Sequence, residues 1–178
     1  MNYNAEVILI IYPHGAGGRF LELLLGSPTV SVDEFKQLIR KQKRLAWMDQ
    51  PQGSFLWQSE FRDQYVIAVH DDIPSEDNLL KFSNLKIIAV VATTDKSVEL
   101  LGRRRKYLGS PALGINETSL RSTFFEGMHP ASWVEIEELW EPVRGVARVK
   151  SLLAQFNIEN EHAEDLYHIW HQQTIAPI

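Results

Sequence analysis

The stretch that decides the fold lies near the start of the chain and reads VILIIYPHGAGGRFLELLL, residues 7–25. Its first part, Val7–Tyr12, is a continuous apolar run rich in β-branched residues, which is typical of a parallel strand buried on both faces. The run stops at the turn Pro13–Gly18, and apolar residues resume at 19–25 as a buried helix. The sequence therefore predicts a strand, a glycine-rich turn and a helix in succession.

Two further runs of this kind follow, at Tyr65–His70 and Lys86–Val91, and each predicts a buried strand. Helices are predicted between and after them, because Ser31–Glu34 forms a capping box and Thr93–Asp95 forms a helix cap. Strands that alternate with helices in this way favour an α/β fold with a short parallel sheet of roughly three to five strands.

Beyond a loop at 109–117 the sequence predicts only helices. Ser132–Glu135 has the pattern of another capping box, and helical patterns cover 143–156 and 161–173. We therefore expect a helical C-terminal third packed on the α/β part of the chain.

Composition limits the class of protein. The chain has 178 residues, a net charge of −5 and no cysteine. The length fits a single domain, with an α/β core at 1–110 and a mainly helical extension at 111–178. Without cysteine, disulfides, thiolate metal sites and cysteine nucleophiles are excluded, and an acidic chain is not expected to bind nucleic acid. Because no stretch approaches the roughly 20 apolar residues that cross a bilayer, we expect a soluble, cytoplasmic protein without a membrane partner.

The glycine-rich turn points to an anion. Because it joins a buried strand to a helix, several backbone N–H groups meet at the positive end of the helix dipole. Such a nest favours phosphate or sulfate, and glycine allows the ligand to approach closely. A second interpretation remains open, in which the turn only packs the helix tightly against the strand.

The turn departs from the Walker pattern G-x-x-x-x-G-K-[ST]. Pro13 replaces the first glycine, Arg19 the lysine and Phe20 the hydroxyl residue. Because that hydroxyl is the usual magnesium ligand, ordinary ATP or GTP hydrolysis is disfavoured and no metal is expected. Arg19 is a candidate to cover the anion in place of the lysine, the alternative being a side chain that points to solvent.

Three segments carry a resemblance to a known family. Residues 11–18 (IYPHGAGG) are similar to the sulfate-donor loop of the sulfotransferase family, which typically reads Y-P-K-S-G-T-T. Residues 66–74 (VIAVHDDIP) resemble the family's strand that ends in K-T-H-L-P. Residues 86–96 (KIIAVVATTDK) resemble its next strand and turn, K-I-I-Y-V-x-R-N-P-K-D. Order and spacing agree over about residues 6–107.

The resemblance implies a three-layer fold of the P-loop NTPase type that binds 3′-phosphoadenosine 5′-phosphosulfate or adenosine 3′,5′-bisphosphate. The implied reaction transfers the sulfuryl group to a small-molecule or glycan acceptor. His14 stands at the position of the loop lysine and would steady the leaving oxygen, and His70 stands at the position of the base. The residues that would cradle the phosphosulfate are Gly15, Ala16, Gly17, Gly18 and Arg19.

The expected grip on the 3′-phosphate differs from the family. The family's arginine after the third strand and its serine eight positions later are Ala92 and Leu100 here. The substitutes we consider lie at the two ends of the following helix and are Thr93, Arg103, Arg104 and Arg105. A solvated helix end is the alternative for the basic cluster.

Two other functions remain open. One is a non-catalytic module that binds a nucleotide or anion, or serves in assembly. The other is phosphoryl transfer to a small molecule, which the missing Lys-Ser/Thr pair weakens.

Two groupings in the C-terminal part are interpreted as structural. Trp133, Trp140 and Trp170 recur at helical spacing and are expected in the core. His168 and His171 share one helix face, where we expect hydrogen bonds or solvent contact rather than a metal ion.

Overall fold

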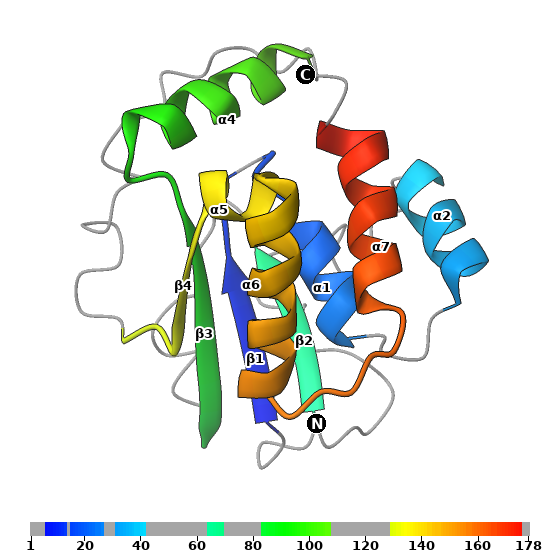
Figure 1. The fold of residues 1–178 in the computed structure, drawn as a ribbon. Helices are drawn as coiled ribbons and strands as arrows, with labels where there is room; N and C mark the ends of the chain where they lie inside the picture. Colours follow the sequence, from blue (N-terminus) through cyan, green and yellow to red (C-terminus); the bar gives the residue numbers. More distant parts are fainter. Residues whose placement is uncertain are drawn as a thin grey trace.

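A computed structural model describes residues 6–13, 15–26, 31–41, 64–69, 83–107 and 129–175. Within these residues the chain is a mixed α/β structure with a four-stranded parallel sheet (Figure 1). The strands, in the spatial order β2-β1-β3-β4, are β1 (Glu6–Ile11), β2 (Gln64–Val69), β3 (Asn84–Val91) and β4 (Ser132–Glu135). The predicted α/β class with a parallel sheet is confirmed. The predicted loop at 109–117 lies outside the described residues.

Strand β1 lies between two others, which explains its apolar sequence. It pairs with β2 on one side, from Glu6 opposite Gln64 to Ile11 opposite Val69, and with β3 on the other side. Because an inner parallel strand is covered on both faces, residues 7–11 are each at most 2% exposed. The three strands predicted from apolar runs are confirmed as β1, β2 and β3.

Strand β4 corrects the prediction for the C-terminal third. The capping box predicted at Ser132–Glu135 is wrong, because these residues pair in parallel with β3. Ser132 and Val134 are buried and Trp133 is exposed, which is the alternation of a strand. Four residues are too few for this alternation to outweigh a capping pattern in the sequence, and pairing with a neighbouring strand decides their conformation.

The described helices are α1 (Gly18–Gly26), α2 (Val32–Lys41), α4 (Asp95–Tyr107), α5 (Ile136–Trp140), α6 (Pro142–Gln155) and α7 (Ala163–Trp170), which continues as the π-helical turn η5 (His171–Ile175). Two of them, α2 and α4, begin at caps that the sequence predicts. The Ser31 hydroxyl accepts from the Glu34 amide at 3.3 Å, and the Glu34 carboxylate accepts from the Ser31 amide at 3.1 Å, which confirms the capping box. At α4 the Thr94 hydroxyl accepts from the Ser97 amide at 3.1 Å.

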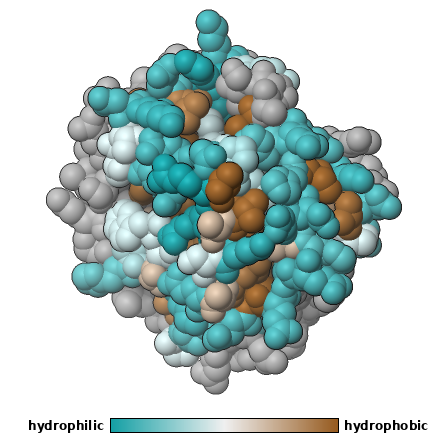
Figure 2. Space-filling view, in the orientation of Figure 1, coloured by the Kyte–Doolittle hydropathy of each residue, from teal (hydrophilic) through white to brown (hydrophobic). Residues whose placement is uncertain are grey.

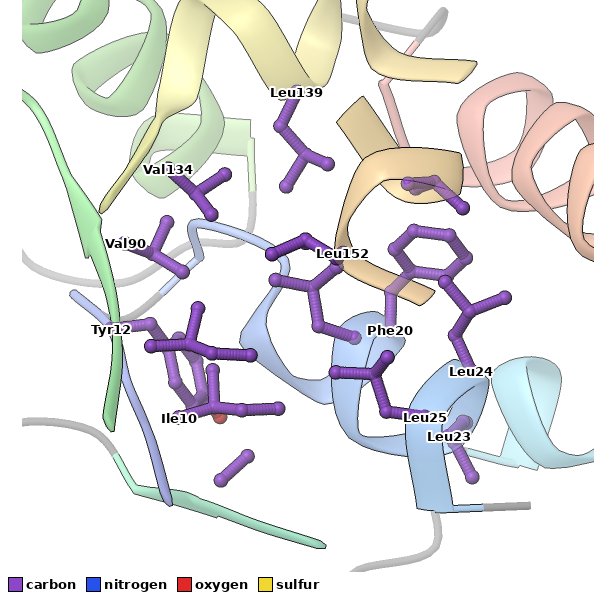
Figure 3. Packing of buried hydrophobic residues seen from close by; sticks show 14 of the residues in the cluster. Ile10, Tyr12, Phe20, Leu23, Leu24, Leu25, Val90, Val134, Leu139 and Leu152 are labelled. Atoms are coloured by element: carbon purple, nitrogen blue, oxygen red, sulfur yellow. The ribbon is translucent and has the colours of Figure 1, made fainter. Parts of the chain in front are cut away.

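One face of the sheet and the helices α1, α5, α6 and α7 enclose the main hydrophobic core. Figure 3 shows Ile10, Val90 and Val134 pointing from the strands toward Phe20 and Leu152 on the helices. Because β4 and the helices after it join the same cluster as β1 and α1, the C-terminal elements share one core with the N-terminal ones.

The opposite face of the sheet carries a separate apolar cluster. Val7, Leu9 and Ile11 of β1 lie there with Ile67 of β2 and Val91 of β3. Successive side chains of a strand point to opposite faces, so β1 contributes alternate residues to the two clusters. Both faces of the sheet are therefore apolar, as expected of a parallel sheet.

The helical face of the molecule is largely polar. Figure 2 shows hydrophobic residues on this face as small areas between hydrophilic ones. Within the described part of the chain, no helix has both the length and the apolar character needed to cross a membrane.

Candidate functional site at the glycine turn

The glycine-rich turn follows β1 and leads into α1, as the sequence predicts. The Ala16 amide donates to the Pro13 carbonyl at 2.9 Å, and the Phe20 amide donates to the Gly17 carbonyl at 3.0 Å, which starts the helix. Gly15 and Gly17 both have a φ of +93°, which favours glycine. The first N–H groups of an α-helix have no acceptor within the helix and lie at the positive end of its dipole.

The turn lies at the carboxyl edge of the sheet, where α/β proteins bind ligands. Strands β2 and β3 lie on opposite sides of β1, so the order of strands in the sheet changes direction at the carboxyl end of β1. Helix α4 crosses above the same edge (Figure 1). The turn therefore has the position of a ligand-binding loop, with α4 as its neighbour.

Two arginines of α4 lie against the turn. A Cβ atom added to Gly15 would be 3.5 Å from Cγ of Arg104 and 3.9 Å from Cγ of Arg105. Both arginines are buried, with exposed fractions of 8% and 7%. The Arg104 guanidinium lies 5.5 Å from the ring centre of Tyr107 and donates to the carbonyl of Thr174 in η5. Its Nε is buried without a hydrogen-bond partner among the described residues, and burial lowers the pKa of Arg104.

Arg103 is not brought to the turn. Its guanidinium forms an ion pair with Glu99 on α4, and its side chain is 58% exposed. Of the three basic residues proposed from the sequence, the structure therefore groups Arg104 and Arg105 with the turn and leaves Arg103 at the surface.

Aromatic rings pack against the other two glycines of the turn. A Cβ atom would be 2.8 Å from the ring of Trp170 at Gly17, and 2.1 Å from the ring of Tyr12 at Gly18. Trp170 is buried and stacks on Phe20, with ring centroids 4.4 Å apart. Packing alone thus requires glycine at both positions, which supports the second interpretation of the turn.

Arg19 forms an ion pair with Glu22 within α1. The Glu22 side chain is 3% exposed, and its Oε1 accepts from the Ala68 amide of β2 at 3.3 Å. Burial raises the pKa of Glu22 to about 7, against the opposing effects of Arg19 and the Ala68 amide. Glu22 was not among the residues identified from the sequence, although one acidic residue within an apolar helical run is a signal for a buried charge.

Thr93 binds a carboxylate of the protein itself. Its amide donates to Glu135 Oε1 at 3.0 Å, and its hydroxyl donates to Glu135 Oε2 at 2.6 Å. The neighbouring Thr94 hydroxyl donates to Glu137 at 2.9 Å. These carboxylates lie at the N-terminus of α4, where the helix dipole stabilises them. A nucleotide phosphate at Thr93 would have to displace Glu135.

The two predicted catalytic residues, His14 and His70, lie outside the described residues. By sequence, His14 belongs to the turn and His70 follows the last residue of β2. At the positions of the family's 3′-phosphate grip, Ala92 is buried and Leu100 packs against the core. Neither side chain offers a phosphate a donor.

The aromatic and imidazole groups of the C-terminal helices have mainly structural partners. Trp140 and Trp170 are buried as predicted, whereas the prediction for Trp133 is wrong, since it lies on the outer face of β4 and is 40% exposed. His171 Nε2 lies 2.8 Å from the Trp140 carbonyl, and His168 lies beside a glutamate of its own helix. Among the described residues, no group of three or more acidic or histidine side chains is arranged to hold a metal ion.

The sequence matches none of the family models and none of the curated proteins with which it was compared. The first amides of α1 are the groups that the turn offers to an oxyanion. The alkyl chains of the two buried residues Arg104 and Arg105 lie against the turn, and the Arg104 guanidinium donates to the Thr174 carbonyl. Arg19 is the third cation near the turn, and Glu22 holds it.

Proposed function

We propose that this protein binds a phosphate-bearing nucleotide of the 3′-phosphoadenosine 5′-phosphosulfate type at the glycine turn, in a P-loop-like α/β fold. One observation carries the proposal. Two buried arginines, Arg104 and Arg105, lie against Gly15, a turn residue with positive φ at the carboxyl edge of the sheet.

Physical chemistry favours an anion at this point. A buried guanidinium loses its hydration, and the loss is offset when its N–H groups find acceptors. Arg104 Nε has no acceptor among the described residues, which costs the folded protein free energy. An oxyanion that accepts a hydrogen bond from this Nε would remove that cost. The N-terminus of α1 favours the same charge.

We further propose sulfuryl transfer as the reaction. The acceptor hydroxyl or amine would attack sulfur and give its proton to His70, while the bond from sulfur to the 5′-phosphate oxygen breaks. His14 would steady the negative charge on that leaving oxygen. Both roles require that the imidazoles lie within hydrogen-bond reach of these atoms.

A non-catalytic anion-binding module is the second candidate. Arg19 and Thr93, two of the groups proposed to hold the donor, bind the carboxylates of Glu22 and Glu135 instead. A ligand would then be held by fewer groups than the sequence predicts. Magnesium-dependent phosphoryl transfer is disfavoured, because Phe20 fills the position of the Walker hydroxyl and is stacked in the core.

A thermal-shift panel tests the proposed function. At about 100 times its Kd, adenosine 3′,5′-bisphosphate would stabilise the protein by about 2.7 kcal/mol, which raises Tm by roughly 5–10 °C. His70→Ala should retain this shift and lose turnover of the phosphosulfate donor. A shift with ATP that requires magnesium would favour a kinase, and a shift without turnover would favour the binding module. If no nucleotide, sulfate or phosphate stabilises the protein, the anion site does not exist.

The arginines of α4 provide a second prediction. Arg104→Gln or Arg105→Gln should weaken adenosine 3′,5′-bisphosphate binding by roughly 10- to 100-fold, the loss expected for one charge-assisted contact. Arg103→Gln makes the same charge change at an exposed position and should alter Kd by less than about twofold. Isothermal titration calorimetry distinguishes these results. Equal effects at Arg103 and Arg105 would indicate a general charge effect rather than a site.

A further inference from the structure

Glu22 is a buried acid of α1 that contacts strand β2. It is on the second turn of α1, and its side chain is 3% exposed. Two groups satisfy it: the guanidinium of Arg19, one turn earlier on the same helix, and the main-chain amide of Ala68 on β2 at 3.3 Å. A carboxylate this deeply buried needs such partners, because water does not solvate it.

The ion pair also restrains Arg19. Arg19 follows the last glycine of the turn, and its side chain is only partly buried, at 28% exposed. It is therefore at the place from which a cation would reach an anion in the turn. As long as Glu22 is ionised, the guanidinium has a competing partner inside the helix.

We propose that Glu22 is a proton-dependent positioning residue that holds Arg19 on α1 when ionised and leaves Arg19 to an oxyanion at the glycine turn when protonated. This inference rests on the proposed anion site at the turn. Glu22 acts through Arg19 and does not itself touch the ligand.

The sign of the effect follows from linkage. Burial raises the pKa of Glu22 to about 7, so the carboxyl changes its charge within the neutral range. The carboxylate and the bound anion compete for Arg19, so a proton on Glu22 and an anion in the turn favour each other. Anion affinity should therefore rise as the pH falls through about 7, and anion binding should raise the pKa of Glu22.

The other charged groups near the turn can be separated from Glu22. From α1 the charge that acts on Glu22 is Arg19, and from β2 the group that faces it is the Ala68 amide. Arginine is by residue type charged throughout the neutral range, so the arginines of α4 are not a source of pH dependence there. His14 and His70 titrate near neutral pH by their residue type, so the experiment must distinguish them from Glu22.

Sulfate is the probe, because its charge does not change between pH 6 and 8. Its Kd, measured by calorimetry, should increase roughly tenfold from pH 6 to pH 8 in the wild-type protein, as expected for an ordinary coupling between two sites. In Glu22→Gln this increase should disappear, with sulfate bound at pH 8 as tightly as the wild type binds it at pH 6. Glu99→Gln removes one exposed carboxylate from α4 and should keep the wild-type pH dependence.

The outcomes separate this inference from the proposed function. An unchanged pH dependence in Glu22→Gln would assign the titration to the histidines and overturn the role of Glu22, while leaving the anion site intact. Absence of sulfate binding at every pH would overturn both. A second measurement does not need the variant: the Glu22 carboxyl, followed by NMR in the wild-type protein, should titrate at higher pH with sulfate present. An identical titration with and without sulfate would also refute the inference.

Discussion

Replacement of Trp170 by alanine is expected to destabilise the fold by about 3–5 kcal/mol, the range for removal of a large aromatic side chain from a core. Trp170 is 3% exposed, stacks on Phe20 and packs against Gly17 of the turn. Its removal would leave a cavity bounded by α1, α7 and the turn. Chemical denaturation followed by circular dichroism should show a lower midpoint with an unchanged m-value.

Trp133→Ala is the matched control for this experiment. It removes the same side chain from a position that is 40% exposed on β4, where the loss should stay below about 1 kcal/mol. A Trp170 variant as stable as the wild type, or no more affected than the Trp133 variant, would mean that α7 does not pack on the glycine turn.

Replacement of Gly145 by alanine is expected to destabilise the protein by about 2–4 kcal/mol, through overpacking and a lost hydrogen bond. The expected effect is opposite in sign to the usual one, because replacing glycine by alanine inside a helix normally stabilises the helix by about 1 kcal/mol. In α6, a Cβ atom at Gly145 would lie 2.1 Å from the Tyr167 hydroxyl oxygen and 2.5 Å from the Leu139 carbonyl oxygen. The Tyr167 hydroxyl donates to that same carbonyl at 2.8 Å, so the buried ring cannot move away without losing a bond. Thermal and chemical denaturation measure the loss.

Gly102 in α4 provides the control of opposite sign. No heavy atom lies within 4 Å of a Cβ atom added there, so Gly102→Ala should stabilise the protein by up to about 1 kcal/mol. In the Gly145→Ala background, Tyr167→Phe should recover part of the stability, since it removes the oxygen that is too close. Stabilisation by both glycine substitutions would contradict the packing of α6 on α7.

The sequence predicts the elements with long or well-capped patterns and misses the short strand. Val7–Ile11 forms five consecutive buried positions rich in β-branched residues, as an inner parallel strand does. The Ser31 and Thr94 caps are equally local signals, because each hydroxyl accepts a hydrogen bond from the amide of the residue three positions later. Strand β4 depends instead on pairing with β3, more than 40 residues earlier, and four residues carry too little pattern to indicate it.

The sequence predicts which residues belong to the candidate site, but not which side chains they pair with. The turn and the basic cluster are visible as residue types, and the structure brings Arg104 and Arg105 to Gly15. The sequence does not show that Arg19 pairs with Glu22, because the orientation of Arg19 depends on the burial of Glu22 against β2. Such pairings follow from tertiary packing, which residue type and spacing do not specify.

Several residues that pack around the glycine turn belong to C-terminal segments, which the ribosome makes long after the turn itself. A nascent chain that has emerged only as far as α4 has the turn and Arg104, but lacks the Trp170 ring and the Thr174 carbonyl that pack on them. Phe20 would remain without its stacking partner until α7 arrives, so this apolar surface would be open to chaperones during synthesis. The turn is therefore expected to mature late in biosynthesis, although β1 is made before the other described strands.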